Sequence, residues 1–286
     1  MIAKNCLFLH SIGHHATPVL CICVCLFCLT FARAEEIKFK TSDGCSISAS
    51  YGAPAGGKLV FVNVHGLGSG KGEWAPFEKL LKMRGLGWLS LDLRGHGQNL
   101  SCEGQGTDYR TFSAGDWNAA SKDIAAAVFW LKKRRISASN IVLCGASVGA
   151  NLVLKAAAEN FLKPAGVIML SPGLTYAGVG IEEYFHRPLP FPLLLAASPD
   201  DNYAWQSSLR LVETAREAGK SVGKTIETAY STGVLAAPSP AVRWGVSFRQ
   251  GVSGHGVNMF SGSGEPLMEE LAGMKWRIKT KPSSGE

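Results

Sequence analysis

A serine between two glycines is the first candidate for chemistry in this chain. Gly145-Ala146-Ser147-Val148-Gly149 follows a short apolar run at 141–144 and precedes an apolar stretch compatible with a helix. G-x-S-x-G at a strand-to-helix turn holds its serine in a strained conformation and lifts the hydroxyl clear of the sheet. The same turn leaves the Val148 N–H at a helix N-terminus, where it could stabilise an oxyanion. The alternative is a glycine-rich turn with an incidental serine, so Ser147 needs partners elsewhere in the chain.

A serine nucleophile requires a base and an acid that orients the base. After such a turn the acid is expected first and the histidine second. His186 and His255 are the histidines after Ser147, and His186 precedes any acid that ends a strand. His255, in a glycine-rich turn after a strand candidate, is therefore the expected base. Asp200 and Asp201 both follow an apolar strand, and either could cap the next helix; we favour Asp201 as the acid and Asp200 as the cap or a solvated neighbour.

The loop 64–70 is the candidate for the second oxyanion donor. It reads Val-His-Gly-Leu-Gly-Ser-Gly, and its glycines would let the backbone approach a substrate closely. The donor is expected in the loop after the third strand, so we assign it to the Leu67 N–H. His65 is expected to shape this loop through hydrogen bonds rather than to take part in catalysis.

The elements that must position these residues alternate between short apolar runs and amphipathic stretches. The expected strands lie at 37–40, 45–51, 59–64, 88–93, 141–144, 167–170 and 193–196. The expected helices lie at 73–84, 148–160, 205–218 and 266–279, and a long helix is expected within 116–133. This order predicts an α/β fold with a mostly parallel sheet, an antiparallel start and helices on both faces. The last strand before His255 could lie near 224–230 or near 244–250, because 221–243 has no clear period.

Taken together, these motifs resemble the α/β-hydrolase superfamily, in particular its esterase, lipase-like and serine-aminopeptidase-like members. The resemblance rests on His65-Gly66-Leu67-Gly68, Asp92-Leu-Arg-Gly-His-Gly97, the Ser147 turn, Asp201 and His255, and extends over about 37–275. It implies a nucleophile, acid and base at Ser147, Asp201 and His255, with no metal or organic cofactor. It also implies structural roles for Arg94 and His96. A lid would enter at 171–192, which is long enough for a loop but not for a helical cap domain.

The N-terminus predicts export from the cytoplasm. Residues 1–34 lack Asp and Glu, and they contain a 13-residue apolar run at 19–31 followed by Ala32-Arg33-Ala34. This pattern is typical of a secretory signal peptide, and the run is short for a membrane span. We therefore expect a signal peptide at 1–34, one α/β-hydrolase domain at 35–286, and a periplasmic or secreted location; an uncleaved anchor or a miscalled start codon is the alternative.

Three cysteines follow this segment, at positions 45, 102 and 144. An odd number leaves at least one thiol free or paired between chains. Cys144 lies in an apolar strand and is expected in the core. Whether Cys45 and Cys102 form a disulfide is left open by the sequence.

The chemistry expected is hydrolysis of a carboxylic ester, thioester or lactone of small to medium size through an acyl-enzyme. An acyltransferase with the same residues, or a non-catalytic binding protein on this scaffold, is the alternative. The net charge of +7 is spread along the chain, and Lys132-Lys-Arg-Arg135 is typical of a helix end rather than of a nucleic-acid surface. No charged subsite is evident. Aromatic residues in the lid region could line the pocket or pack on the core: Tyr176, Tyr184, Phe185 and Phe191, with His186 among them.

Overall fold

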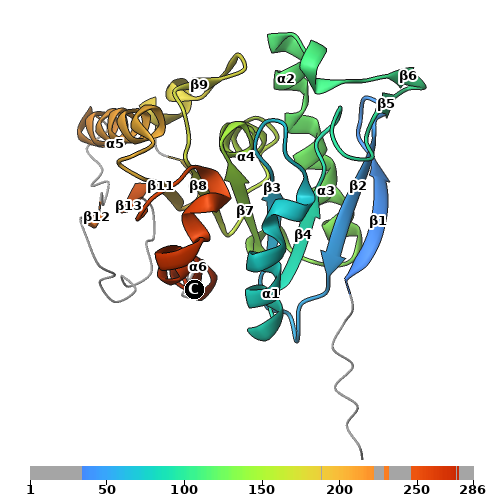
Figure 1. Cartoon of the computed structure of the whole chain (residues 1–286), viewed down its shortest axis with the longest axis horizontal. Coiled ribbons are helices and arrows are strands. Elements are labelled where there is room, and N and C mark those ends of the chain that lie inside the picture. Colours follow the sequence, from blue (N-terminus) through green and yellow to red (C-terminus); the bar gives the residue numbers. More distant parts are fainter. Residues whose placement is uncertain (1–33, 188, 222–228, 232–245, 275, 277–286) are drawn as a thin grey trace, which may run out of the picture. The chain divides into compact units, whose positions relative to one another are not determined.

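The structure, a computed structural model, describes residues 34–187, 189–221, 229–231, 246–274 and 276. Its centre is a nine-stranded sheet in the order β1-β2-β4-β3-β7-β8-β11-β13-β12 (Figure 1). The first two pairings, β1 with β2 and β2 with β4, are antiparallel, and the pairings from β4 to β12 are parallel. The predicted sheet with an antiparallel start is therefore confirmed.

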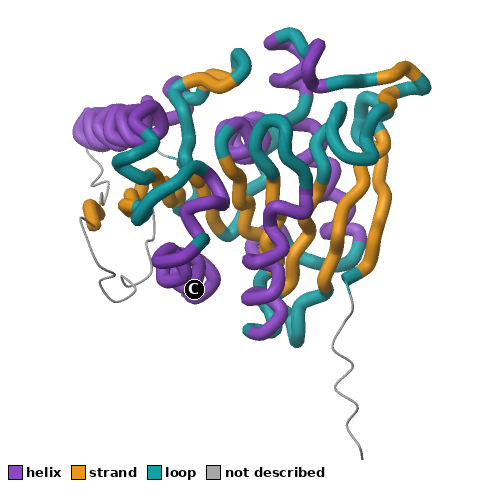
Figure 2. Tube along the Cα trace, in the orientation of Figure 1, coloured by secondary structure: helices purple, strands orange, loops and turns teal. Residues whose placement is uncertain are grey.

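The strands of this sheet lie side by side in Figure 2. Their bounds are β1 Glu35–Lys40, β2 Ser46–Gly52, β3 Val60–Val64, β4 Gly87–Leu91, β7 Ile141–Ala146, β8 Gly166–Leu170, β11 Leu193–Ala197, β12 Ala229–Ser231 and β13 Val246–Gln250. Two short hairpins stand outside it, formed by β5 Ser101–Cys102 with β6 Gln105–Gly106 and by β9 Thr175–Tyr176 with β10 Val179–Gly180. The α-helices are α1 Ala75–Met83, α2 Ala114–Ala119, α3 Ser121–Lys133, α4 Val148–Glu159, α5 Asn202–Ser221 and α6 Glu265–Gly273.

Each central strand is buried on both faces because its side chains alternate between two cores. In β3, Val60, Val62 and Val64 face one core and Phe61 faces the other. The first core contains residues of α3, α4 and α5, and the second contains residues of α1 and α6. Since successive side chains of a strand point to opposite faces, an uninterrupted apolar strand needs helices on both sides. The carboxyl ends of the parallel strands consequently meet at one edge of the sheet, where the candidate residues lie.

The long helix expected within 116–133 is α3, and the shorter α2 precedes it. The two are separated at Ala120, whose N–H bonds back to the carbonyls of Asp116 and Trp117 in a tight turn. No glycine or proline marks this break, so composition could not reveal it. The helix expected over 266–279 ends at Gly273, after which Met274 is extended.

Of the two candidates for the last strand, the one near 244–250 is β13; the other lies mostly outside the described residues, at 224–228, and only its end is described, within β12. β13 pairs with β11 and precedes His255, while β12 adds to its far side. Between β8 and β11 the described residues form only the β9–β10 hairpin and a 3-10 turn at Glu182–His186, in agreement with the minimal cap expected. None of the described helices is long and apolar enough to cross a membrane.

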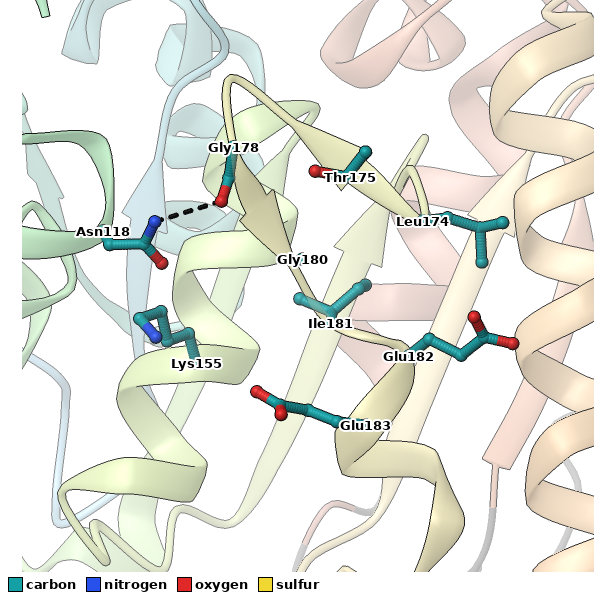
Figure 3. A pocket seen from close by; sticks show the side chains of 9 residues that line it. All are labelled: Asn118, Lys155, Leu174, Thr175, Gly178, Gly180, Ile181, Glu182 and Glu183. Atoms are coloured by element: carbon teal, nitrogen blue, oxygen red, sulfur yellow. Dashed lines mark hydrogen bonds between the residues drawn. The ribbon is translucent and has the colours of Figure 1, made fainter. Parts of the chain in front are cut away.

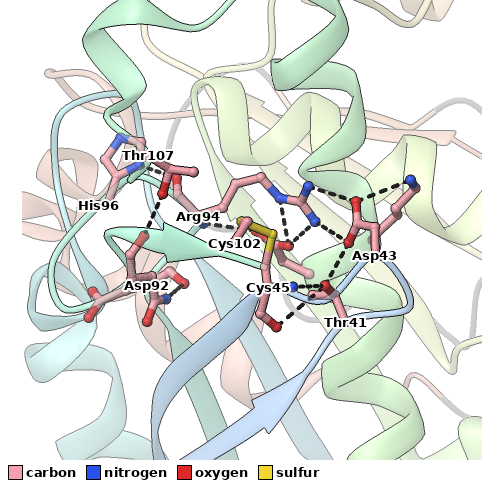
Figure 4. Close-up of a disulfide and its surroundings, with 11 residues drawn as sticks. Thr41, Asp43, Cys45, Asp92, Arg94, His96, Cys102 and Thr107 are labelled. Carbon is pink, nitrogen blue, oxygen red and sulfur yellow. Dashed lines mark hydrogen bonds and ion pairs between the residues drawn. A yellow bond between two sulfur atoms is a disulfide. The ribbon is translucent and has the colours of Figure 1, made fainter. Parts of the chain in front are cut away.

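A disulfide joins Cys45 to Cys102, which settles the pairing that the sequence left open. Figure 4 shows it beside Arg94, whose guanidinium bonds to the Asp123 carboxylate at 2.7 Å and to Asp43 at 2.8 Å. Burial raises the pKa of Asp43, but the hydrogen bonds from Arg94 and Thr41 outweigh it and hold that pKa well below its usual value. Arg94 is therefore structural, as expected, and Cys144 is buried and free.

Candidate active site

Ser147 lies at the turn between β7 and α4 with φ 55° and ψ −123°, in the left-handed region that L-residues rarely adopt. The glycines on either side make this turn possible. A Cβ on Gly149 would lie 2.5 Å from the His65 carbonyl oxygen, and a Cβ on Gly145 would collide with the Gly149 backbone. The turn is thus closed so tightly that only glycine fits at both positions, as the motif predicts.

His255 and Asp201 come from the carboxyl ends of two neighbouring strands, β13 and β11. His255 Nδ1 lies 2.6 Å from Asp201 Oδ2, so the ring donates that proton to the carboxylate and keeps Nε2 available. The second carboxylate oxygen of Asp201 accepts from Ala204 N–H in the first turn of α5, at 3.4 Å. Asp201 therefore contacts the histidine and caps a helix at once, and of the two roles expected for Asp200 the exposed neighbour is the one observed.

The loop that carries His255 is anchored on both sides of the histidine. Gly254 N–H donates to the Asp200 carboxylate at 3.1 Å, and Gly256 N–H donates to Ser171 Oγ at 2.9 Å. Ser171 is fully buried at the end of β8 and has a positive φ of 50°. The backbone on both sides of His255 is therefore held by hydrogen bonds, which limits the movement of the imidazole ring relative to Ser147.

Ser147 and His255 line one cavity of about 320 Å³. We call it the Ser147 cavity; its lining comprises Gly66, Leu67, Ser69, Glu73, Ala146, Ser147, His255, Gly256, Val257 and Asn258. No direct hydrogen bond joins Ser147 Oγ to His255 in the part of the chain that the structure describes. Such contacts commonly tighten only in the substrate complex. Asp201 is not in the lining, and its side chain is mostly buried behind the histidine, with 15% of its surface exposed.

The loop after β3 is held so that the Leu67 N–H has no partner among the described residues. Gly66 N–H donates to Glu73 Oε1 at 3.1 Å, and Gly68 N–H donates to His96 Nε2 at 3.3 Å. The peptides on either side of Leu67 are thus fixed, and the Leu67 N–H remains free for a ligand. The Val148 N–H is likewise free of an intrahelical partner, because it opens α4.

Two buried histidines form the support of this loop. Leu93 N–H donates to His65 Nε2 at 2.9 Å, which leaves His65 Nδ1 to donate to the Gly66 carbonyl at 2.7 Å. Burial lowers the pKa of His65 to about 4, so the ring is neutral in this arrangement. His96 stacks on Tyr109 with ring centroids 4.0 Å apart, and burial lowers its pKa as well. Both histidines are structural, as the sequence analysis expected.

Of the two alternatives for the aromatic residues of the lid region, packing on the core holds for most of them. Tyr184, Phe185 and Phe191 are buried in the core, and Tyr184 donates its hydroxyl hydrogen bond to Glu159 at 2.7 Å. His186 is exposed. Tyr176 alone lies near the site, with its ring edge-on to His255 at a centroid distance of 6.2 Å.

Two residues of the site escaped sequence analysis. Glu73, from the 3-10 turn at Lys71–Trp74, lines the Ser147 cavity, and Ser171 anchors the His255 loop. Neither belongs to a motif, and only the folded chain brings them to the site.

A second hollow, of about 540 Å³, lies between α4 and the β9–β10 hairpin (Figure 3). It contains Lys155 and Glu183, and Asn118 closes one side by donating to the Gly178 carbonyl at 3.0 Å. Its described lining includes no serine or histidine, so it offers no base and nucleophile of the kind found in the Ser147 cavity. Among the described residues, no cluster of three or more histidine, cysteine or acidic side chains could hold a metal ion.

Comparison with known proteins agrees with this architecture. The model of the alpha/beta hydrolase family matches residues 59–273, and the chain therefore belongs to that family. The search of curated proteins gave no match.

Solved structures with a similar fold include an esterase of Pyrococcus furiosus, with a TM-score of 0.62 and 16% identity, covering 84% of this chain and 89% of that chain. They also include a hormone-sensitive lipase from a metagenome library, with a TM-score of 0.56 and 18% identity, covering 84% of each chain. At these identities the likeness shows the fold.

Proposed function

We propose that the protein is a serine hydrolase of carboxylic esters, with Ser147 as nucleophile, His255 as general base and Asp201 as the acid that orients the base. One observation carries the proposal. His255 is held by Asp201 through a 2.6 Å contact at Nδ1 and shares a cavity with a serine on a strained turn. A serine hydroxyl becomes nucleophilic only when such a base is oriented beside it.

In the proposed reaction, His255 Nε2 takes the Ser147 proton as Oγ attacks the ester carbonyl carbon. The carbonyl oxygen becomes an oxyanion, which accepts hydrogen bonds from the Leu67 and Val148 N–H groups. His255 then gives its proton to the leaving alcohol as the C–O bond breaks, and an acyl-enzyme remains. His255 then deprotonates a water molecule as its oxygen attacks the acyl carbon, and it gives this proton to Ser147 Oγ as the bond between Oγ and the acyl carbon breaks and the acid leaves.

The substrate proposed is a small-molecule ester of small or medium size, since the Ser147 cavity has a volume of about 320 Å³. Thioesters and lactones would use the same chemistry. About 44% of the His255 side chain is exposed, so water can reach the base, which favours hydrolysis over acyl transfer.

We also propose that the chain is exported, with 1–34 as its signal peptide. Two observations support this: the N-terminal pattern of the sequence and the Cys45–Cys102 disulfide, a bond typical of oxidising compartments.

The test is hydrolysis of p-nitrophenyl acetate and butyrate by the wild type and by Ser147→Ala. Ser208→Ala is the matched control, because Ser208 is a buried serine on α5, outside the Ser147 cavity. We expect Ser147→Ala to lose at least about 10³-fold in kcat/KM, while the control keeps wild-type turnover. Equal turnover by Ser147→Ala and the wild type would refute the proposal.

A further inference from the structure

Glu73 places a carboxylate in the wall of the Ser147 cavity. Its Oε1 accepts from Gly66 N–H at 3.1 Å, and its side chain is only partly exposed. Burial raises the pKa of Glu73, and hydrogen bonds from Ser69 and Gly66 oppose that effect. One oxygen of the carboxylate is thus committed to the protein, and the group is not freely solvated.

Among the described residues, no lysine or arginine neutralises this carboxylate, and the His255 ring in the same cavity attracts it without forming an ion pair. The lining of the Ser147 cavity includes no lysine or arginine, and Glu73 forms no ion pair among the described residues. Lys71, two residues away, is bound instead by Asp92 at 3.0 Å and by Glu36 at 3.5 Å. By contrast, the buried carboxylates Asp92 and Asp123 each have a cationic partner.

A partly buried charge without a partner is costly, and a ligand that supplies the opposite charge recovers that cost. We propose that Glu73 determines specificity by binding an organic ammonium group in the acyl or alcohol part of the substrate. This inference rests on the proposed ester hydrolysis at Ser147 and names its substrate class: small esters with a cationic group near the scissile bond. It departs from the sequence analysis, which found no charged subsite.

The geometry supports the assignment because the same residue supports the loop of the Leu67 N–H. Gly66, bound by Glu73, directly precedes Leu67. A cation bound by the Glu73 carboxylate would therefore lie on the side of the cavity where the substrate carbonyl accepts its hydrogen bonds. A unit charge about 5 Å away at an effective dielectric constant of about 20 attracts strongly enough for a more than tenfold effect after solvent screening.

The experiment compares isosteric esters that differ only in charge. Acetylcholine is paired with 3,3-dimethylbutyl acetate, and glycine ethyl ester with ethyl propionate, so that the cation lies on the alcohol side in one pair and on the acyl side in the other. For each pair, the ratio of kcat/KM for the cationic ester to that for the neutral ester is measured in the wild type, Glu73→Gln and Glu217→Gln. Glu217 is exposed on α5 and provides a matched loss of charge outside the cavity.

We expect the ratio to fall about tenfold in Glu73→Gln for at least one pair, and to stay unchanged in Glu217→Gln. Glutamine keeps an acceptor for Gly66 N–H, so the ratio isolates the charge from the support of the loop. An unchanged ratio in both pairs, with Ser147-dependent hydrolysis of the neutral esters, would overturn this inference alone. Absence of Ser147-dependent hydrolysis of all four esters would overturn the proposed function as well.

A measurement on the wild type does not depend on the folding of a variant. Choline and 3,3-dimethylbutanol have the same shape and differ in charge, and both can be tested as inhibitors of p-nitrophenyl acetate hydrolysis. We expect choline to inhibit at a concentration at least about tenfold lower, as one charge-assisted contact implies. Equal inhibition by the two compounds, together with an unchanged ester ratio, would refute the ammonium site.

Discussion

The adjacent carboxylates Asp200 and Asp201 allow the proposed acid to be tested with an internal control. Asp201 Oδ2 contacts His255 Nδ1 at 2.6 Å, whereas Asp200 accepts from the backbone N–H of Gly254 in the same loop, at 3.1 Å, and does not contact the ring. Asparagine has the shape of aspartate but no charge. Asp201→Asn should therefore remove the stabilisation of the His255 imidazolium that forms in the transition state, and it also permits the wrong ring tautomer.

The size of the effect follows from this geometry. Opposite unit charges 2.6 Å apart attract by about 6 kcal/mol at an effective dielectric constant of about 20. Because 44% of the His255 side chain is exposed, solvent screens part of this attraction. We therefore expect a loss of about 3 to 5 kcal/mol, or about 10² to 10⁴-fold in kcat. Asp200→Asn should lower kcat by less than about threefold, since it alters an exposed side chain whose amide oxygen can still accept from Gly254.

The assay is steady-state hydrolysis of p-nitrophenyl butyrate by both variants, with circular dichroism to show that each remains folded. The reasoning would be refuted if Asp200→Asn lost as much kcat as Asp201→Asn, or if Asp201→Asn kept wild-type kcat. In the first case Asp200 would share the role, and in the second the 2.6 Å contact would not matter for turnover.

Three further predictions concern the supports of the site. Ser171→Ala should destabilise the fold by about 1–3 kcal/mol in urea unfolding and also lower kcat, because the buried Gly256 N–H loses its acceptor. Ser208→Ala removes a hydroxyl without a protein partner and should change neither quantity. Equal losses of stability and kcat in the two variants would contradict this prediction. Replacing Cys45 and Cys102 by alanine should lower stability by up to about 4 kcal/mol, since the bridge spans a separation of 57 residues; wild-type and variant melting temperatures that agree without reductant would contradict it. Burial lowers the pKa of His65 from 6.5 to about 4, so between these pH values the unfolded chain binds a proton at this ring and the folded chain does not. The contribution of His65 to the free energy of unfolding is therefore complete above pH 6.5, and up to about 3 kcal/mol of it is lost as pH falls to 4. An NMR titration in which the His65 ring of the folded protein protonates near pH 6.5 would contradict this.

The order of elements and the identity of the central residues could be read from the sequence because both depend on local patterns. The alternation of apolar strands and amphipathic helices gave the parallel sheet, and the glycines at 145 and 149 marked the turn at Ser147. Boundaries failed where no local signal exists. The interruption between α2 and α3 at Ala120 depends on how the two helices pack, and the sequence has no glycine or proline at this position.

The remainder of the site depends on contacts between residues far apart in sequence. Glu73 reaches the Ser147 cavity because the turn before α1 folds over the end of β3, and Ser171 meets Gly256 across 85 positions. The role of the aromatic residues of the lid region was left open for the same reason. Composition cannot distinguish a tyrosine in the core, such as Tyr184, from one beside the site, such as Tyr176.

Reaction with a fluorophosphonate serine probe, followed by mapping of the labelled peptide, shows whether Ser147 is a nucleophile activated by His255. We expect labelling at Ser147 that is lost in His255→Ala and slowed in Asp201→Asn. Absence of labelling in well-folded protein, or labelling of a different serine, would contradict this expectation.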